Sequence, residues 1–184
     1  MKITKVTEDA VATLLDDLLK RSPNNYTGYA DKVQAIIDDV RERGDEALFE
    51  MTKRFDGADL NADNIRVTQA EIDEAYTLVD ASLIEVIRKA MTNIRVYHEK
   101  QRQYGWFDTT PDGTILGQKV TPLQSTGVYV PGGKAAYPSS VLMNVIPAKV
   151  AGVEKIVMVT PPGKDGKVNP STLVAANEAG ADEI

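Results

Sequence analysis

The chain contains no cysteine and a single histidine, His98, among its 184 residues. Without cysteine there can be no disulfide framework and no thiolate metal site. One histidine is also too few to build a catalytic zinc site, with its usual three protein ligands, from nitrogen and sulfur donors. Carboxylates alone would suit calcium or magnesium, but no D-x-D-x-D loop occurs. We therefore predict neither a metal-ligand set nor a catalytic residue within this sequence.

Long apolar runs and clusters of basic residues are missing as well. No apolar run reaches the roughly 18 residues that a membrane-spanning helix needs. Residues 1–10 carry lysines with no apolar stretch behind them, which is unlike a signal peptide. The net charge of −6 argues against a nucleic-acid surface, which would need clustered Lys and Arg. These absences predict a soluble cytoplasmic protein that binds neither nucleic acid nor membrane.

What the sequence does have is a globular composition, with 42% hydrophobic and 26% charged residues, which argues against disorder. Helical periodicity and capping signals dominate up to about residue 103. Two capping boxes, Thr68–Glu71 and Ser82–Glu85, predict the last two helices of this half, the second running to about residue 103. The elements predicted before them are helices over residues 8–20 (capped by Thr7), 29–43 and 45–55, and a short strand over 64–67.

The pattern changes after Gly105, where turn signals and short apolar runs begin to alternate with helical segments. The sequence Pro111-Asp-Gly113 predicts a turn. The elements predicted after it are strands over residues 114–120, 128–130 and 153–159, helices over 140–151 and from Asn169 to Gly180, and the start of a strand over 181–184. Strands that alternate with helices predict an α/β fold with a parallel sheet.

This change of pattern suggests two domains. We assign residues 1–122 to a mainly helical N-terminal region with short strands, and residues 123–184 to a truncated α/β nucleotide-binding unit. A parallel sheet of two or three strands leaves an unpaired apolar edge. We therefore expect the complete protein to continue beyond Ile184, and this chain in isolation to associate with other copies.

Residues 127–151 read as a buried strand, a glycine-rich turn and the start of a helix. This is the arrangement by which α/β proteins hold a ligand at the carboxyl end of a strand. Gly132 and Gly133 would let a ligand approach the backbone closely, and the helix start near Ser139 would offer amides to an anion. A tight strand-to-helix turn without any ligand accounts for the same residues equally well.

Tyr129 is the candidate ligand-binding side chain of this strand. It alternates with Val128 and Val130 and so faces away from them, where its ring could stack on an adenine or a ribose. A core tyrosine is the alternative. The common phosphate-binding motifs are absent, because Val128 and Ala135 replace the glycine and the Ser/Thr of the P-loop and no G-x-G-x-x-G occurs. His98 follows a helical stripe among charged neighbours, and we expect it to face solvent.

The sequence strongly resembles histidinol dehydrogenase at residues 127–144, 146–153 and 158–163, and upstream at 41–48 and 53–57. The resemblance covers at least residues 40–184 in matching order. It implies incomplete Rossmann-like units akin to the aldehyde dehydrogenase architecture. It also implies a homodimeric enzyme of histidine biosynthesis with one zinc per site, which oxidises L-histidinol to L-histidine in two hydride transfers to NAD.

The resemblance transfers one site residue to this chain. Tyr129 matches the tyrosine of the family's G-x-Y-V-P-G-G strand, which belongs to its NAD site. The family's zinc ligands and its Glu-His base pair match no position here, and His98 is none of them. The resemblance therefore implies part of a dehydrogenase that has no activity by itself. The alternative is a stand-alone, non-catalytic α/β module that binds a nucleotide or a partner protein.

Overall fold

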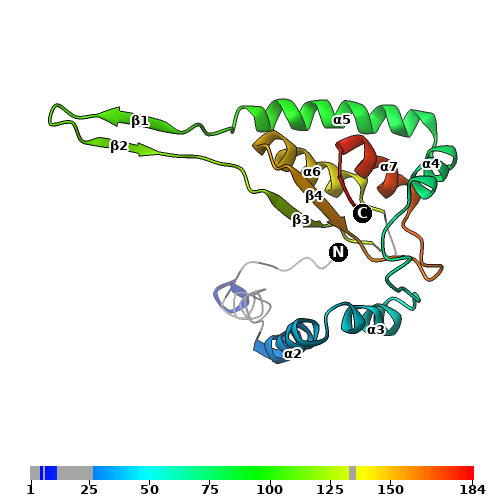
Figure 1. Cartoon of the computed structure of the whole chain (residues 1–184). Coiled ribbons are helices and arrows are strands. Elements are labelled where there is room, and N and C mark those ends of the chain that lie inside the picture. The colour runs from blue at the N-terminus through cyan, green and yellow to red at the C-terminus, as the bar shows by residue number, and fades with distance from the viewer. Residues whose placement is uncertain (1–4, 6, 12–26, 133–135) are drawn as a thin grey trace. The chain divides into compact units, whose positions relative to one another are not determined.

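The computed structural model describes residue 5 and residues 7–11, 27–132 and 136–184. The chain divides into two compact units, residues 1–47 and 48–184 (Figure 1). This division does not coincide with the boundary at residues 122 and 123 that the change of sequence pattern suggests.

The first unit is helical where it is described. Thr7 caps a helical turn over residues 8–11, because its Oγ1 accepts the Ala10 N–H at 3.2 Å. The rest of the predicted helix over residues 8–20 lies outside the described residues. The predicted helix over 29–43 is confirmed as α2 (Thr27–Arg43). The next helix, α3 (Asp45–Phe55), starts in this unit and continues into the second.

The second unit is α/β, as the sequence predicts. Its parallel strands β3 and β4 pair with Tyr129 opposite Val159. An isolated parallel bridge joins Val157 to Glu183 in the segment predicted to start another strand. The elements that follow α3 are α4 (Gln69–Leu78), α5 (Ala81–Glu99), β1 (Trp106–Thr109), β2 (Ile115–Gln118), β3 (Ser125–Tyr129), α6 (Pro138–Ala151), β4 (Lys155–Val159) and α7 (Pro170–Ala179).

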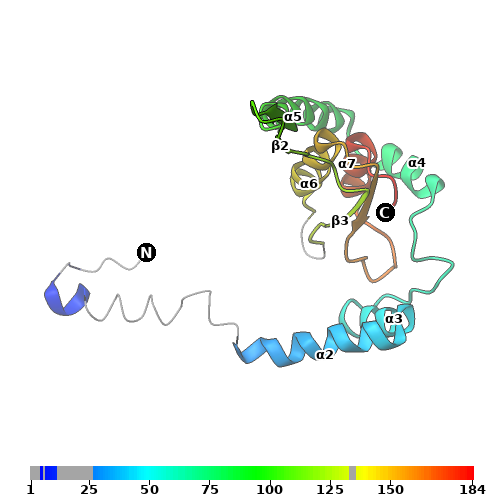
Figure 2. The ribbon, with the colours of Figure 1, turned by 60° about the vertical axis from the view of Figure 1, so that its left-hand side comes forward.

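The core of this unit lies between the parallel strands and the helices. Figures 1 and 2 show α6 and α7 packed against one face of the β3–β4 pair, with α5 on their outer side. Burying these apolar side chains is the main stabilising contribution to the unit. The largest fully buried side chains are those of Val130, Val141, Val145, Ile146, Ile156, Met158 and Val174.

The strands β1 and β2 form a separate antiparallel hairpin, which extends away from the helices in Figure 1. Every residue of both strands is exposed. The sequence predicts the turn at 111–113 and a strand after it, although β2 is shorter than the predicted range of 114–120. The first strand, Trp106–Thr109, is not predicted, because its four residues carry no periodic pattern of their own.

Three other predictions about local structure are wrong. Residues 64–67 form a turn and bend in place of a strand. A local turn precedes them, in which the Asn64 side chain accepts the Asn61 N–H and the Asn61 side chain accepts the Asp63 N–H. The helix α5 is capped by Asp80, whose carboxylate accepts the Ser82 N–H at 2.7 Å, so Ser82 lies inside the helix. That helix also ends at Glu99, a turn before the predicted end near residue 103. The capping box at Thr68–Glu71 is confirmed.

Candidate functional site

The carboxyl ends of β3 and β4 lie side by side and define the edge of the sheet where α/β proteins bind ligands. Tyr129 is the last residue of β3, and its side chain is 62% exposed, whereas the next residue, Val130, is fully buried. Tyr129 and Val130 therefore face opposite sides of the sheet, as their alternation predicts. The structure excludes the alternative that Tyr129 is a core residue.

A cavity of about 260 Å³ lies beside Tyr129 in the second unit. Its walls are largely apolar, and Tyr129 is the only aromatic residue among the described residues that line it. Two carboxylates, Asp56 and Glu71, belong to the lining, and no Lys or Arg is found among its described residues. Glu71 is already engaged, because it accepts both the N–H and the hydroxyl of Thr68 at 2.8 Å. The apolar lining residues include Leu60, Ile65, Val159, Pro161 and Ile184.

The glycine-rich turn after β3 packs against the loop that follows β4. A Cβ atom at Gly132 would lie 2.8 Å from the Pro161 carbonyl oxygen, which is too close for any side chain. Close approach of protein backbone thus explains Gly132 without a ligand, as the alternative reading of the turn expects. Gly133 lies outside the described residues.

A second cleft, of about 410 Å³, adjoins this turn at the start of α7. Lys167 lines it and hydrogen-bonds to the carboxylate of Glu74 at 3.0 Å, which raises the pKa of Lys167 above its usual value. The Asn169 side chain caps α7 by accepting the Ser171 N–H at 3.0 Å, as the sequence predicts. The charge of Lys167 and the first amide of α7 are therefore already paired within the protein.

The start of α6 offers fewer amides to an anion than the sequence suggests. The helix begins at Pro138, which has no N–H, and the Ser140 N–H donates to the Tyr137 carbonyl oxygen at 3.0 Å. No side chain caps this helix. The predicted anion site near Ser139 therefore lacks most of the donors that such a site needs.

The described residues contain no cluster of three or more His, Asp or Glu side chains that could hold a metal ion. Each helix in the described part of the chain is too short or too polar to cross a membrane.

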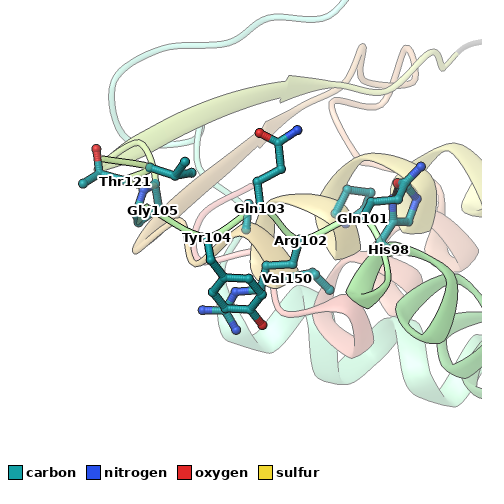
Figure 3. A pocket seen from close by; sticks show the side chains of 12 residues that line it. His98, Gln101, Arg102, Gln103, Tyr104, Gly105, Thr121 and Val150 are labelled. Atoms are coloured by element: carbon teal, nitrogen blue, oxygen red, sulfur yellow. Dashed lines mark hydrogen bonds between the residues drawn. The ribbon is translucent and has the colours of Figure 1, made fainter. Parts of the chain in front are cut away.

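His98 lies near the end of the predicted helix, on α5, but it is less exposed than the sequence suggests. It is half-buried and lines a cleft of about 350 Å³ between the end of α5, the start of the hairpin and the end of α6 (Figure 3). Its Nδ1 lies 2.7 Å from Gln101 Oε1. In the same cleft the Arg102 guanidinium lies over the Tyr104 ring, 5.4 Å from its centroid. We call this the foot cleft, because it lies at the foot of the hairpin.

Comparison with known proteins shows the family of the chain, which its geometry alone does not. A family model described as histidinol dehydrogenase matches residues 19–184. The chain belongs to the histidinol dehydrogenase family. The histidinol dehydrogenase of Heliobacterium mobile is 55% identical over 169 residues, which make up 92% of this chain and 40% of the relative. That of Bacillus subtilis is 58% identical over 167 residues, 90% of this chain and 39% of the relative.

A solved structure agrees with these relatives. The crystal structure of histidinol dehydrogenase from Elizabethkingia anophelis matches with a TM-score of 0.76 and 37% identity, and covers 83% of this chain and 35% of that protein. The resemblance inferred from residues 127–163 is thereby confirmed. The chain spans about 40% of the length of the curated relatives it matches.

The sequence identifies Tyr129 but misses the rest of the cavity wall. Leu60 and Ile65 precede α4, whereas Pro161 follows β4, and the fold brings these loops together beside Tyr129. The one available signal is the run Thr160-Pro-Pro-Gly163, a loop directly after a buried strand. Nothing in the sequence near residues 60–65 marks them as a cavity wall.

Proposed function

We propose that this chain supplies part of the NAD-binding region of a histidinol dehydrogenase that oxidises L-histidinol to L-histidine in histidine biosynthesis. The proposal includes a Rossmann-like unit over residues 123–184, a zinc ion in the complete enzyme, a cytoplasmic location and a homodimer. It rests on membership of the family and, within the chain, on one observation. That observation is the exposed ring of Tyr129 beside an apolar cavity at the carboxyl end of a parallel strand.

The cavity beside Tyr129 suits one part of NAD. Its volume of about 260 Å³ is too small for a whole dinucleotide but comparable with a nucleoside. An apolar wall and an aromatic ring favour a base or a ribose that stacks on Tyr129. The carboxylates of Asp56 and Glu71 would repel a pyrophosphate. We therefore place the nucleoside inside the cavity and the phosphates outside it.

The role of the chain in the reaction is then to bind NAD and to orient it. NAD, when bound, supplies the hydride acceptor. Tyr129 holds the nucleoside, and apolar residues such as Ile65 and Val159 exclude water from it. The zinc ion does not fit the described residues, which offer no ligand cluster. We propose that its ligands and the acid–base groups are absent from this chain, so that it has no dehydrogenase activity by itself.

A calorimetric titration of the 184-residue chain with NAD tests the binding proposal. We expect Tyr129→Ala to weaken NAD binding at least tenfold, because stacking on an aromatic ring contributes about 1–3 kcal/mol per base. Tyr129→Phe keeps the ring and should bind nearly as well as the natural protein.

Tyr97→Ala is the matched control, because Tyr97 is also 62% exposed but lies on α5, away from the cavity lining. Equal NAD affinities for Tyr129→Ala and Tyr97→Ala would contradict the assignment of Tyr129. Histidinol-dependent NAD reduction by the purified chain would contradict the proposal that the chain is inactive alone.

A further inference from the structure

The hairpin has two chemically different faces. Side chains of residues paired across an antiparallel ribbon point to the same side, so the strand register shows which side chains share a face. One face carries Trp106, Asp108, Leu116 and Gln118, and the other carries Phe107, Thr109, Ile115 and Gly117. We call the second set the Phe107 face. It has no charged residue, and its two large side chains, Phe107 and Ile115, are 70% and 67% exposed.

Gly117 shapes the Phe107 face. A Cβ atom at this position would collide with the Phe107 ring and with the Trp106 carbonyl oxygen. The ring of Phe107 therefore lies across the glycine, and the face is flat enough for another surface to approach. A two-stranded ribbon is marginally stable by itself in water, and an uncharged apolar face of this kind is typical of an interaction site.

The two ends of the hairpin carry opposite charges. Asp112 lies at the tip, where its carboxylate accepts the Thr114 N–H at 3.0 Å and has no cationic partner among the described residues. Arg102 lies at the foot, in the foot cleft, and likewise pairs with no carboxylate in the described part of the chain. Lys119 follows β2 at the same end. Each ribbon thus has an acidic tip and a basic foot.

We propose that the Phe107 faces of two copies of this chain pack against each other about a two-fold axis, with the tip of each ribbon in the foot cleft of the other. This inference deepens the homodimer of the proposed function by naming its surface. A two-fold interface uses the same patch on both copies, so the patch must be complementary to itself. A ribbon with an apolar middle and ends of opposite charge meets that requirement.

The spacing along the ribbon agrees with this arrangement. The middle of the paired segment lies between the pairs Phe107–Gly117 and Asp108–Leu116. A two-fold axis at that level places residue 112 of one copy beside residues 103 and 121 of the other. Gln103 and Thr121 both line the foot cleft. The cleft volume of about 350 Å³ is sufficient for the side chains of a tight turn.

Analytical ultracentrifugation of the 184-residue chain tests the apolar contact. We expect a reversible dimer, and a rise in its dissociation constant of at least about 100-fold for the double variant Phe107→Ser, Ile115→Thr. Leu116→Thr is the matched control, because Leu116 is 58% exposed on the opposite face of the same ribbon, and should leave the constant within about threefold. A monomer, or equal effects of the two changes, would overturn the proposal.

A charge exchange tests the contact between tip and foot. Arg102→Glu and Asp112→Lys should each weaken the dimer about tenfold or less, as expected for exposed charges. Mixing the two variants should restore association, because the mixed dimer has opposite charges at both junctions. Asp112→Asn, which keeps the acceptor that caps the turn, checks that the loss does not come from a disordered turn. A mixture no tighter than either variant would contradict the pairing.

The single tryptophan of the chain reports which face is covered. In the natural protein Trp106 lies on the face opposite Phe107, so its fluorescence should change little on dilution. In the double variant Trp106→Phe, Phe107→Trp, emission should shift to longer wavelength as the dimer dissociates. A dimer in which the emission of neither tryptophan position changes on dissociation forms through another surface, and would overturn the inference.

NAD titration of the interface variants separates the dimer proposal from the NAD-binding proposal. A variant that loses the dimer but keeps its NAD affinity shows that the ribbon acts in association and not in NAD binding.

Discussion

The two pairs of strands in the second unit have opposite environments. The parallel pair β3–β4 joins Ser125–Tyr129 to Lys155–Val159, and it packs one face against helices that bury Ile156 and Met158 completely. The antiparallel pair β1–β2 buries none of its residues. Both pairs contain large apolar side chains. The difference shows that apolar content alone does not place a strand in the core, because the core also needs helices that the chain folds back onto it.

The comparison also separates two kinds of stability. Side chains between the parallel strands and α6 and α7 contribute to the global free energy of unfolding, because losing them exposes the whole core. The hairpin can open locally without disturbing that core. Substitutions in the core should therefore lower the global free energy of unfolding, whereas substitutions in the hairpin should change mainly its local opening.

The largest expected difference concerns one isoleucine in each region. Ile146→Ala should lower the free energy of unfolding by about 2–5 kcal/mol, because it leaves a cavity at a fully buried position of α6. Ile115→Ala should lower it by less than about 0.5 kcal/mol, because the side chain is mostly exposed. Urea denaturation followed by circular dichroism, at a concentration where the chain is monomeric, measures both. Similar losses would mean that the hairpin belongs to the cooperative core.

Two glycines with nearly the same backbone conformation sharpen the comparison. Gly180 ends α7 with φ of +86°, and Gly113 lies in the hairpin turn with φ of +87°. Alanine is strained at such angles by about 1–2 kcal/mol. We expect Gly180→Ala to lower the free energy of unfolding by that amount, and Gly113→Ala to change mainly the hydrogen exchange of hairpin amides. A loss of global stability for Gly113→Ala would show that the hairpin unfolds together with the core.

The smallest expected effect concerns an ion pair between two helices of the core, α5 and α7. Glu178 on α7 accepts hydrogen bonds from Arg88 on α5, at 2.8 and 2.9 Å, and from the Tyr76 hydroxyl on α4 at 2.8 Å. Arg88 and then Tyr76 hold the pKa of Glu178 below its usual value, although burial opposes them. Glu178→Gln should lower the free energy of unfolding at pH 7 by about 1 kcal/mol.

The pH dependence has a definite sign. Because the folded pKa of Glu178 is lowered, its contribution is fully present above the usual carboxyl pKa near 4.5 and is lost as the pH falls through the lower folded value. The difference in stability between the natural protein and Glu178→Gln should therefore shrink below about pH 4.5. A difference that stays constant from pH 7 to pH 3 would show that Glu178 acts through its shape and not through its charge.

Local signals in the sequence predict much of the fold. The capping box at Thr68–Glu71 and the Asn169 cap, each of which depends on residues close in sequence, are confirmed. Ser82 is the exception, because Asp80 offers a carboxylate to the same helix start and takes the capping position. The first hairpin strand also fails, since Trp106–Thr109 becomes a strand only by pairing with residues 115–118.

The candidate site could be predicted only in part. The alternation around Tyr129 and its place at the end of a strand depend on neighbouring residues, and both are confirmed. The cavity beside it depends on Leu60 and Pro161, which the fold brings together from distant parts of the chain. No periodicity or capping rule reports such a contact. The family resemblance identifies the strand correctly, but it describes neither the cavity nor the exposed hairpin.

The link between Tyr76 and Glu178 also constrains how the chain folds. These residues lie 102 positions apart, so the hydrogen bond closes a long loop. Closing such a loop costs conformational entropy before any contact compensates for it, and contacts of high sequence separation slow folding. The hairpin, whose strands are joined by a short turn, can form early, whereas α4 and α5 can dock on α7 only after nearly the whole second unit has been synthesised.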